Sequence, residues 1–168
     1  MADTPLVLKA AQIAAAPFDF RHPLDDNAEI RLFALSRITG LSNTSVSLAH
    51  IAPGRCSYPK HRHHAADEWI YLLSGTATLD MDGEVHSLGP GDFAAFPAGG
   101  PAHKLTNTGS ETLVYLMGGN RAALEVADFP EQGQRLTIGN SGPMPQAELS
   151  PLDAHAAFDY FSRDKDDA

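Results

Sequence analysis

The sequence predicts an all-β protein built as an antiparallel sandwich or barrel. Between residues 45 and 117, short apolar or alternating runs are separated by turns rich in Gly, Pro, Asp and Asn, and no helical period interrupts them. Asp82-Gly83 lies between two such runs and is the strongest short hairpin signal in the chain. Close strand spacing of this kind is typical of antiparallel sandwiches and barrels.

Each strand is predicted from a run and from the turns that bound it. The central strands are expected at 45–51, 68–73, 76–81, 84–88, 93–96, 103–106 and 112–117. Residues 29–38 predict one or two further edge strands, whereas the first twenty residues are ambiguous. The run at 122–128 is compatible with a strand or with a helical turn.

The C-terminal part of the chain differs in composition from the central strands. Residues 139–151 contain three prolines and two glycines and predict an extended arm. A short helix is expected at 154–161 and a charged, fraying tail at 163–168. There is no internal repeat, so we expect a single domain over 1–168, with a barrel core at about 30–135 and an arm and tail at 136–168.

Composition excludes several classes of function. The 168 residues are 43% hydrophobic and 20% charged, with a formal net charge of −9, which argues against a nucleic-acid partner. No apolar run reaches membrane-spanning length, and residues 1–20 lack the pattern of a secretory signal, so a cytoplasmic location is expected. Cys56 is the single cysteine, and we interpret it as a small residue packed beside a turn rather than as a ligand or nucleophile.

Two groups of histidines, about forty positions apart, carry the chemistry. His61 and His63 are two apart, so on an extended strand their side chains share a face. Glu68 opens the apolar run that follows, and His103 is the only histidine between residues 88 and 154. Three imidazoles and one carboxylate form a suitable ligand set for a divalent metal ion. The predicted metal ligands are therefore His61, His63, Glu68 and His103.

The carboxylate ligand has a competitor in Asp67. We favour Glu68 because of its longer side chain and its spacing to Gly75. As a separate check, an inward-facing Glu68 places Ile70 and Leu72 in the barrel lining. Trp69 and Tyr71 would then face outward, toward the other layer or a partner subunit.

The remaining polar residues receive structural interpretations. His64 should point away from the ligands, although a role as a substitute ligand or nearby base is the alternative. Asn107 is interpreted as a turn-stabilising residue. Tyr58, Arg55, Arg62 and Lys104 lie near ligands in sequence, but strand parity places Arg62 and Lys104 on the outward side, and no catalytic residue is assigned. The other histidines, His22, His50, His86 and His155, are interpreted as ordinary surface or internally satisfied residues.

These residues resemble the two motifs of the cupin superfamily. The first motif is matched by Gly54, His61, His63, Glu68 and Gly75, and the second by Gly91, Pro97, Gly99, His103 and Asn107. The chain has one extra residue between Gly54 and His61 and one between Gly99 and His103, both in expected loops. The resemblance implies a double-stranded β-helix, a jelly-roll-like barrel, of the small single-domain bacterial kind and frequently assembled as a homodimer.

The expected ligand set leads to two functional hypotheses. Four protein ligands on an octahedral ion leave two positions for a small molecule, and nitrogen-rich ligation suits Zn, Mn, Fe or Ni, with zinc as the first expectation for the isolated protein. The first hypothesis is a metal-dependent dioxygenase, isomerase or lyase acting on a small polar or carboxylate-bearing molecule. The alternative is a non-catalytic module that binds or senses a small ligand.

Overall fold

The computed structural model describes residues 4–140 and 146–155, and these residues form three antiparallel sheets. The largest sheet has six strands in the order β1 (Phe18–Arg21), β2 (Glu29–Phe33), β3 (Thr44–Ile51), β10 (Leu113–Asn120), β5 (Glu68–Ser74) and β8 (Phe93–Phe96). A four-stranded sheet has the order β13 (Gln146–Pro151), β12 (Gln134–Gly139), β11 (Leu124–Phe129) and β4 (Arg62–His63). The third sheet has the order β7 (Glu84–Leu88), β6 (Ala77–Met81) and β9 (His103–Asn107).

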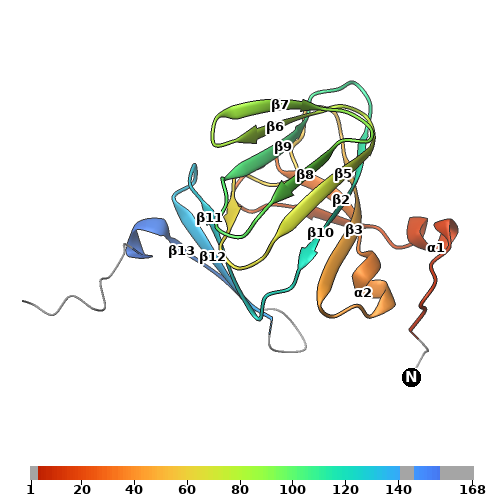
Figure 1. Ribbon diagram of the computed structural model, residues 1–168, viewed down its shortest axis with the longest axis horizontal. Coiled ribbons are helices and arrows are strands. Elements are labelled where there is room, and N and C mark those ends of the chain that lie inside the picture. Colours follow the sequence, from red (N-terminus) through yellow and green to blue (C-terminus); the bar gives the residue numbers. More distant parts are fainter. Residues whose placement is uncertain (1–3, 141–145, 156–168) are drawn as a thin grey trace, which may run out of the picture.

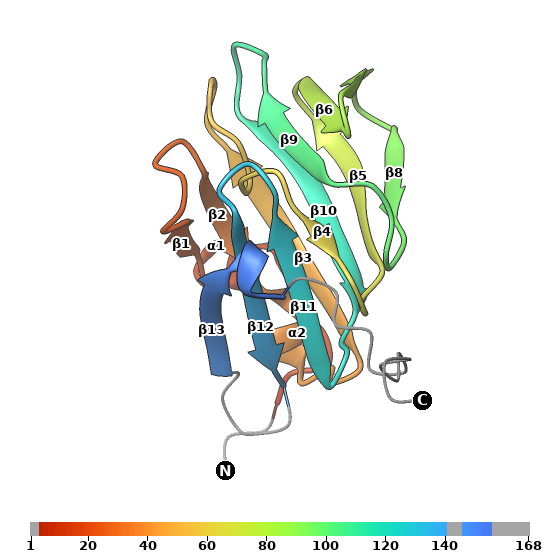
Figure 2. The same cartoon turned by 90° about the vertical axis from the view of Figure 1, so that its left-hand side faces the viewer.

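The two smaller sheets face the six-stranded sheet and enclose the core. Figure 1 shows the three-stranded sheet along the top and the four-stranded sheet at the left, and Figure 2 shows β11 and β12 in front of β3 and β10. Isolated bridges from Cys56 to Thr106 and from His61 to His103 connect the segment before β4 to β9. This is the expected all-β double-stranded β-helix.

Strand parity sorts the side chains as predicted. On β5, Ile70 and Leu72 are 4% and 0% exposed, whereas Tyr71 is 39% exposed. Because alternate residues of a strand face opposite sides, Glu68 shares the inward face with Ile70 and Leu72. The core that they join is made of Ile30, Ala49, Ile51, Ile70, Leu72, Ala77, Leu79, Phe96, Leu105, Leu113 and Tyr115.

Gly75 shows why the motif requires glycine at the end of β5. Its φ is +85°, a left-handed conformation that side chains disfavour. A Cβ at this position would also lie 2.9 Å from the Leu113 Cα on β10. The chain can therefore turn from β5 toward β6 while remaining tightly packed against β10 only if this residue is glycine.

Three predictions outside the central strands need correction. Residues 29–38 contain one strand, as the prediction allowed, but this strand, β2, lies between β1 and β3 and is not an edge strand. It is followed by the helix α2 (Leu35–Thr39), which ends at Gly40 with a left-handed φ of +75°. Residues 146–151 of the expected extended arm form the strand β13, which pairs along its whole length with β12 and so belongs to a sheet. The sequence interpretation also assigned no strand to β12, whereas the ambiguous run at 122–128 is the strand β11.

The chain ends lie partly outside the described residues. The N-terminal segment forms α1 (Ala10–Ala14) and β1, and a short 3-10 helix, η1 (Leu152–His155), follows β13. The helix predicted at 154–161 falls mostly outside the described residues, and the charged tail at 163–168 falls entirely outside them. Among the described residues, no helix is long and apolar enough to cross a membrane.

Candidate metal centre

Three segments bring the four predicted ligands together. His61 and His63 lie on the segment that ends in β4, Glu68 is the first residue of β5, and His103 is the first residue of β9. His61 and His103 are joined by two backbone hydrogen bonds, in which each N–H donates to the other's carbonyl oxygen at 3.0 and 2.8 Å. The extra residues in the two loops therefore leave the strand pairing at the histidines intact.

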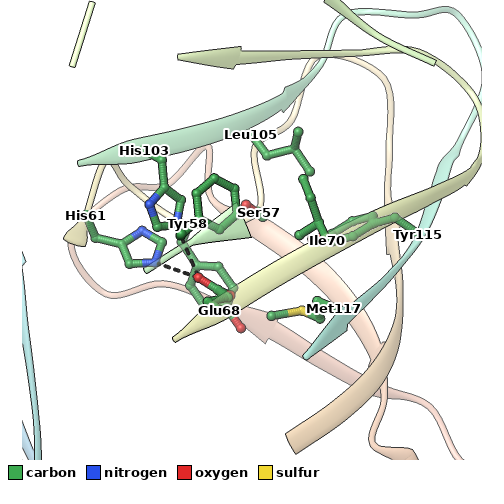
Figure 3. A pocket seen from close by; sticks show the side chains of 10 residues that line it. Ser57, Tyr58, His61, Glu68, Ile70, His103, Leu105, Tyr115 and Met117 are labelled. Atoms are coloured by element: carbon green, nitrogen blue, oxygen red, sulfur yellow. Dashed lines mark hydrogen bonds and ion pairs between the residues drawn. The ribbon is translucent and has the colours of Figure 1, made fainter. Parts of the chain in front are cut away.

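The carboxylate of Glu68 lies at the centre of the cluster. Its Oε2 is 3.1 Å from His103 Nε2, 3.2 Å from His63 Nε2 and 3.8 Å from His61 Nε2. One donor atom from each of the four residues lies within 4.8 Å of all the others. Figure 3 shows His61, His103 and Glu68 pointing toward one another from different strands. The four residues therefore form one cluster that could hold a metal ion.

The geometry and the donor chemistry fit a divalent ion. Donor atoms that each lie about 2.0–2.2 Å from one ion are at most about 4.4 Å from one another. The four donor atoms here lie within 4.8 Å of one another, so they would need to move together only slightly to bind an ion. His61 Nδ1 lies 2.9 Å from the carbonyl oxygen of Pro59, and His103 Nδ1 lies 3.5 Å from that of Pro101. A carbonyl oxygen can only accept, so with a metal ion bound Nδ1 would keep its proton and the Nε2 lone pair would be free to coordinate the ion.

The electrostatics keep the cluster suited to binding a cation. Burial opposes ionisation of Glu68, but hydrogen bonds from His103, His61 and His63 hold its pKa well below the usual range. Burial lowers the pKa of His103, which favours the neutral ring that a metal ion requires. The pKa of His63 is raised, because the interactions with Glu68 and Glu125 outweigh burial.

Aromatic side chains fix the imidazole rings. Phe96 is stacked on His103, with ring centroids 3.7 Å apart and planes 8° from parallel. Phe129 is stacked on His61 at 5.8 Å, and Tyr58 meets His61 edge-on at 5.6 Å. The rings of His61 and His103 are therefore held in orientation by apolar contacts as well as by hydrogen bonds.

A cavity of about 270 Å³, a volume that includes space open to solvent, adjoins the cluster. It is lined by Ser57, Tyr58, His61, Glu68, Ile70, Phe96, His103, Leu105, Tyr115 and Met117 (Figure 3). The pKa of Tyr58 is raised, by burial and then by the charge of Glu68, and the pKa of Tyr115 is raised chiefly by burial. Both phenols stay protonated at neutral pH and are available as hydrogen-bond donors.

The alternatives considered for the ligand set lie elsewhere. Asp67 accepts a hydrogen bond from the Ala98 N–H at 2.9 Å, so it stabilises the loop before β9. His64 turns away from the cluster, and its Nε2 lies 2.8 Å from Asp128 Oδ2. Cys56 is fully buried, and burial raises the pKa of its thiol, which leaves it in the less reactive form.

The other polar residues near the ligands are also accounted for. Arg62 and Lys104 form ion pairs with Asp128 and Asp25, and neither lines the cavity, as parity predicted. Arg55 pairs with Glu29 at 3.8 Å. Of the four residues Tyr58, Arg55, Arg62 and Lys104, Tyr58 alone lines the cavity.

Three of the four remaining histidines have described side chains, and these lie outside the ligand cluster. His22 is buried and accepts from the Leu24 N–H, His50 packs edge-on against Phe33, and His86 lies 3.5 Å from Glu84. The side chain of His155 lies outside the described residues.

Sequence reasoning missed part of the site. Tyr115 and Met117 reach the cavity from β10, through a pairing with β5 that shifts register between Val114 and Tyr115. Glu125, on β11, lies 3.6 Å from His63 Nδ1. Leu105 lies two positions after His103 on β9, so both side chains face the same side of the strand. This alternation could have identified Leu105 as a cavity residue from the sequence.

Asp128 connects β11 to β12 and to the β4 segment. Its side chain is fully buried, with Arg135 Nε at 2.6 Å, His64 Nε2 at 2.8 Å and Arg62 Nη2 at 3.2 Å. Burial opposes ionisation, but hydrogen bonds from Arg135, His64 and Arg62 hold the pKa of this carboxyl far below its usual range.

Replacing Asp128 with asparagine is expected to lower the free energy of unfolding by about 2 kcal/mol at pH 7. Because the pKa of Asp128 is depressed in the folded state, its contribution to the free energy of unfolding is present in full above the unfolded-state pKa of about 4. This contribution is lost as pH falls from that value toward the folded-state pKa. Urea unfolding at pH 7 and near pH 3.5 would measure this, with Asp19→Asn at an exposed ion pair as the control. An equal difference at both pH values would contradict the explanation.

The fold and the site together define a small single-domain double-stranded β-helix with a His/Glu cluster that can hold a metal ion. The family model for the cupin domain matches residues 47–119. Two solved structures cover most of the chain. A candidate sugar phosphate isomerase from Acidithiobacillus ferrooxidans ATCC 23270 is 33% identical, with a TM-score of 0.83, covering 91% of this chain and 96% of that one.

The second structure is a sugar phosphate isomerase from Silicibacter pomeroyi DSS-3, which is 26% identical, with a TM-score of 0.72, covering 82% of this chain and 87% of that one. Quercetin 2,3-dioxygenase from Bacillus subtilis (strain 168) is 36% identical over 69 residues, which are 40% of this chain and 20% of that protein. The chain thus aligns with only one fifth of its curated relative. The chain belongs to the cupin superfamily.

Proposed function

We propose that the protein is a divalent-metal-dependent enzyme that acts on a small polar or carboxylate-bearing molecule, by isomerase, dioxygenase or lyase chemistry. The observation that carries this proposal is that His61, Glu68 and His103 belong both to the ligand cluster and to the cavity wall. A small molecule in the cavity would therefore lie against the donors of the metal ion. A purely structural metal site is normally closed by its ligands.

The cavity favours a small molecule without a phosphate group. Its empty volume is about 270 Å³, part of which is open to solvent, so the enclosed space beside the ligand cluster suits only a small molecule. Among the described residues, the lining contains neither lysine nor arginine, so only the metal ion and the histidines would offset the charge of a phosphate dianion. Two structural relatives carry the name sugar phosphate isomerase, and we infer that the substrate here has at most one carboxylate, together with hydroxyl or carbonyl groups.

The residues of the chain supply binding and orientation. When bound, a divalent ion would stabilise negative charge on a substrate oxygen or lower the pKa of a bound water. Tyr58 and Tyr115, held protonated, can donate hydrogen bonds to substrate oxygens, while Phe96 and Ile70 exclude water from one side of the cavity. Zinc is the proposed ion for the isolated protein, with Mn, Fe and Ni as the others that suit the donors. The homodimer and the cytoplasmic location stay predictions.

The proposal is tested by turnover. The protein is loaded separately with Zn²⁺, Mn²⁺, Fe²⁺ and Ni²⁺ and incubated with small hydroxy acids, keto acids, unphosphorylated sugars and sugar phosphates. Product formation is followed by NMR and by oxygen consumption. We expect metal-dependent conversion of an unphosphorylated compound, at least about 100-fold slower in a folded His103→Ala variant.

The alternative of a ligand-binding or sensor module predicts a different result. Compounds would then bind to the metal-loaded protein without conversion under any of these conditions. Conversion of sugar phosphates alone would overturn the inference about the substrate class, while leaving the metal-dependent activity in place.

A further inference from the structure

Glu125 lies beside the metal ligands and has no role in the proposal above. Its side chain is 7% exposed, and its Oε1 lies 3.6 Å from His63 Nδ1. Its Oε1 accepts backbone hydrogen bonds from Val126 at 3.0 Å, His64 at 3.1 Å and Ala65 at 3.4 Å. The carboxylate is therefore fixed by the backbone in one position.

Two buried atoms at this place have no hydrogen-bond partner. One is His63 Nδ1 and the other is Glu125 Oε2. His63 Nδ1 lies 3.6 Å from Glu125 Oε1, just beyond hydrogen-bond distance. Because both groups are buried, a shift of a few tenths of an ångström would let His63 Nδ1 form a hydrogen bond with the Glu125 carboxylate.

The other two histidines show what His63 lacks. The Nδ1 atoms of His61 and His103 each face the carbonyl oxygen of a proline two residues earlier in the chain. For His63, the residue two positions earlier is His61, whose carbonyl oxygen already accepts the backbone N–H of His103 at 2.8 Å. His63 therefore requires an acceptor from another strand, and Glu125 occupies that position.

We propose that Glu125 is a positioning residue that accepts the Nδ1 proton of His63 and so directs His63 Nε2 toward the metal ion. The inference rests on the metal site of the proposed function but not on any catalytic activity. A carboxylate behind a metal-bound imidazole fixes its tautomer and strengthens it as a ligand, and losing such a partner typically costs about 10–100-fold in metal affinity.

The test compares Glu125→Gln with a matched variant, Asp128→Asn. In Glu125→Gln, the glutamine retains an oxygen for the three backbone N–H groups but removes the charge. Asp128→Asn is the control, because Asp128 is a buried acid of the same strand that contacts His64 rather than His63. Affinity for Zn²⁺ is measured by competition with a chromophoric chelator. We expect Glu125→Gln to bind Zn²⁺ about 10–100-fold more weakly, and Asp128→Asn to stay within about threefold of the wild type.

A second readout follows the proton itself. In ¹⁵N-histidine-labelled protein, long-range ¹H–¹⁵N spectra report which ring nitrogen of His63 is protonated, and a His63→Asn variant assigns the signal. We expect Nδ1 to be protonated in the wild type, and Glu125→Gln to shift this proton and speed its exchange with water. Unchanged Zn²⁺ affinity in Glu125→Gln, an equal loss in Asp128→Asn, or an Nδ1 without a proton in the wild type would overturn the proposal.

The failure of the metal site is distinguishable from the failure of this inference. If the wild-type protein binds no divalent ion, the proposed function is wrong. The spectra of the metal-free protein then still decide whether Glu125 holds the Nδ1 proton of His63, since an unchanged signal in Glu125→Gln would exclude the contact.

Discussion

Replacing Glu68 with glutamine is expected to weaken the binding of Zn²⁺ or Mn²⁺ by more than about 100-fold, because loss of a group behind a ligand already costs about 10–100-fold. Glu68 is the only anionic member of the cluster, and its Oε2 lies within 3.8 Å of all three histidine Nε2 atoms. Glutamine keeps the size of the side chain but removes the charge that offsets the charge of the ion. Chelator competition and calorimetric titration would measure the change.

Asp67→Asn is the matched control for this experiment. Asp67 precedes Glu68 in the chain, and its carboxylate accepts a hydrogen bond from the Ala98 N–H instead of facing the histidines. We expect its metal affinity to stay within a few-fold of the wild type, with at most a modest loss of stability. If Asp67→Asn abolished binding and Glu68→Gln did not, the assignment of the carboxylate ligand would be wrong.

Metal affinity should also fall as pH is lowered. A proton and a metal ion compete for the same imidazole nitrogens, and the pKa of His63 is raised above the ordinary value of about 6.5 in the metal-free protein. The decline is therefore expected to begin at a higher pH than for an isolated histidine site. Titrations at several pH values accompany the comparison of Glu68→Gln with the wild type.

The ligand residues could be predicted because their signals are local. His61 and His63 are two positions apart, Glu68 opens an alternating strand, and His103 follows the Pro97-x-Gly99 turn. Parity then decides which side of each strand faces inward, and the burial of Ile70 and Leu72 agrees with it. Such information is contained in a few neighbouring residues, so it survives in a single sequence.

The remainder of the site depends on pairings between distant strands. Tyr115 and Met117 reach the cavity only because β10 pairs with β5 through an irregular register. Glu125 reaches His63 because β11 pairs with β4, which places Ala127 opposite His63. No pattern within β10 or β11 specifies the partner strand or its register, so these contacts could not be predicted from local periodicity.

The C-terminal strands show a further limit of local signals. The prolines and glycines of 139–151 predicted an extended arm, and proline lacks the N–H needed within a sheet. In the structure Pro151 is the last residue of β13, which is the edge strand of its sheet, where a missing donor costs little. Proline therefore marked the end of an edge strand rather than the absence of a strand.

Replacing Asn107 with alanine is expected to lower the free energy of unfolding by about 3 kcal/mol, with a melting temperature lower by about 6–12 °C. Asn107 ends β9 and is 0% exposed. Its Nδ2 donates to the carbonyl oxygens of Ile51 and Glu111, both at 2.8 Å, and its Oδ1 accepts from the Gly109 N–H at 3.0 Å. Alanine leaves these groups without their side-chain partner in a place with little access to water.

Two further variants separate this explanation from a general intolerance of change. Asn140→Ala removes an exposed side-chain hydrogen bond to the Ala122 carbonyl and should change stability by no more than about 0.5 kcal/mol. Asn107→Asp keeps the acceptor, loses both donors and buries a charge, so it should be less stable than Asn107→Ala. Equal stabilities of Asn107→Ala and the wild type in urea unfolding would contradict the bonding role. Because His103 is held at the other end of β9 by its pairing with His61, we expect the Zn²⁺ affinity of folded Asn107→Ala to remain within a few-fold of the wild type.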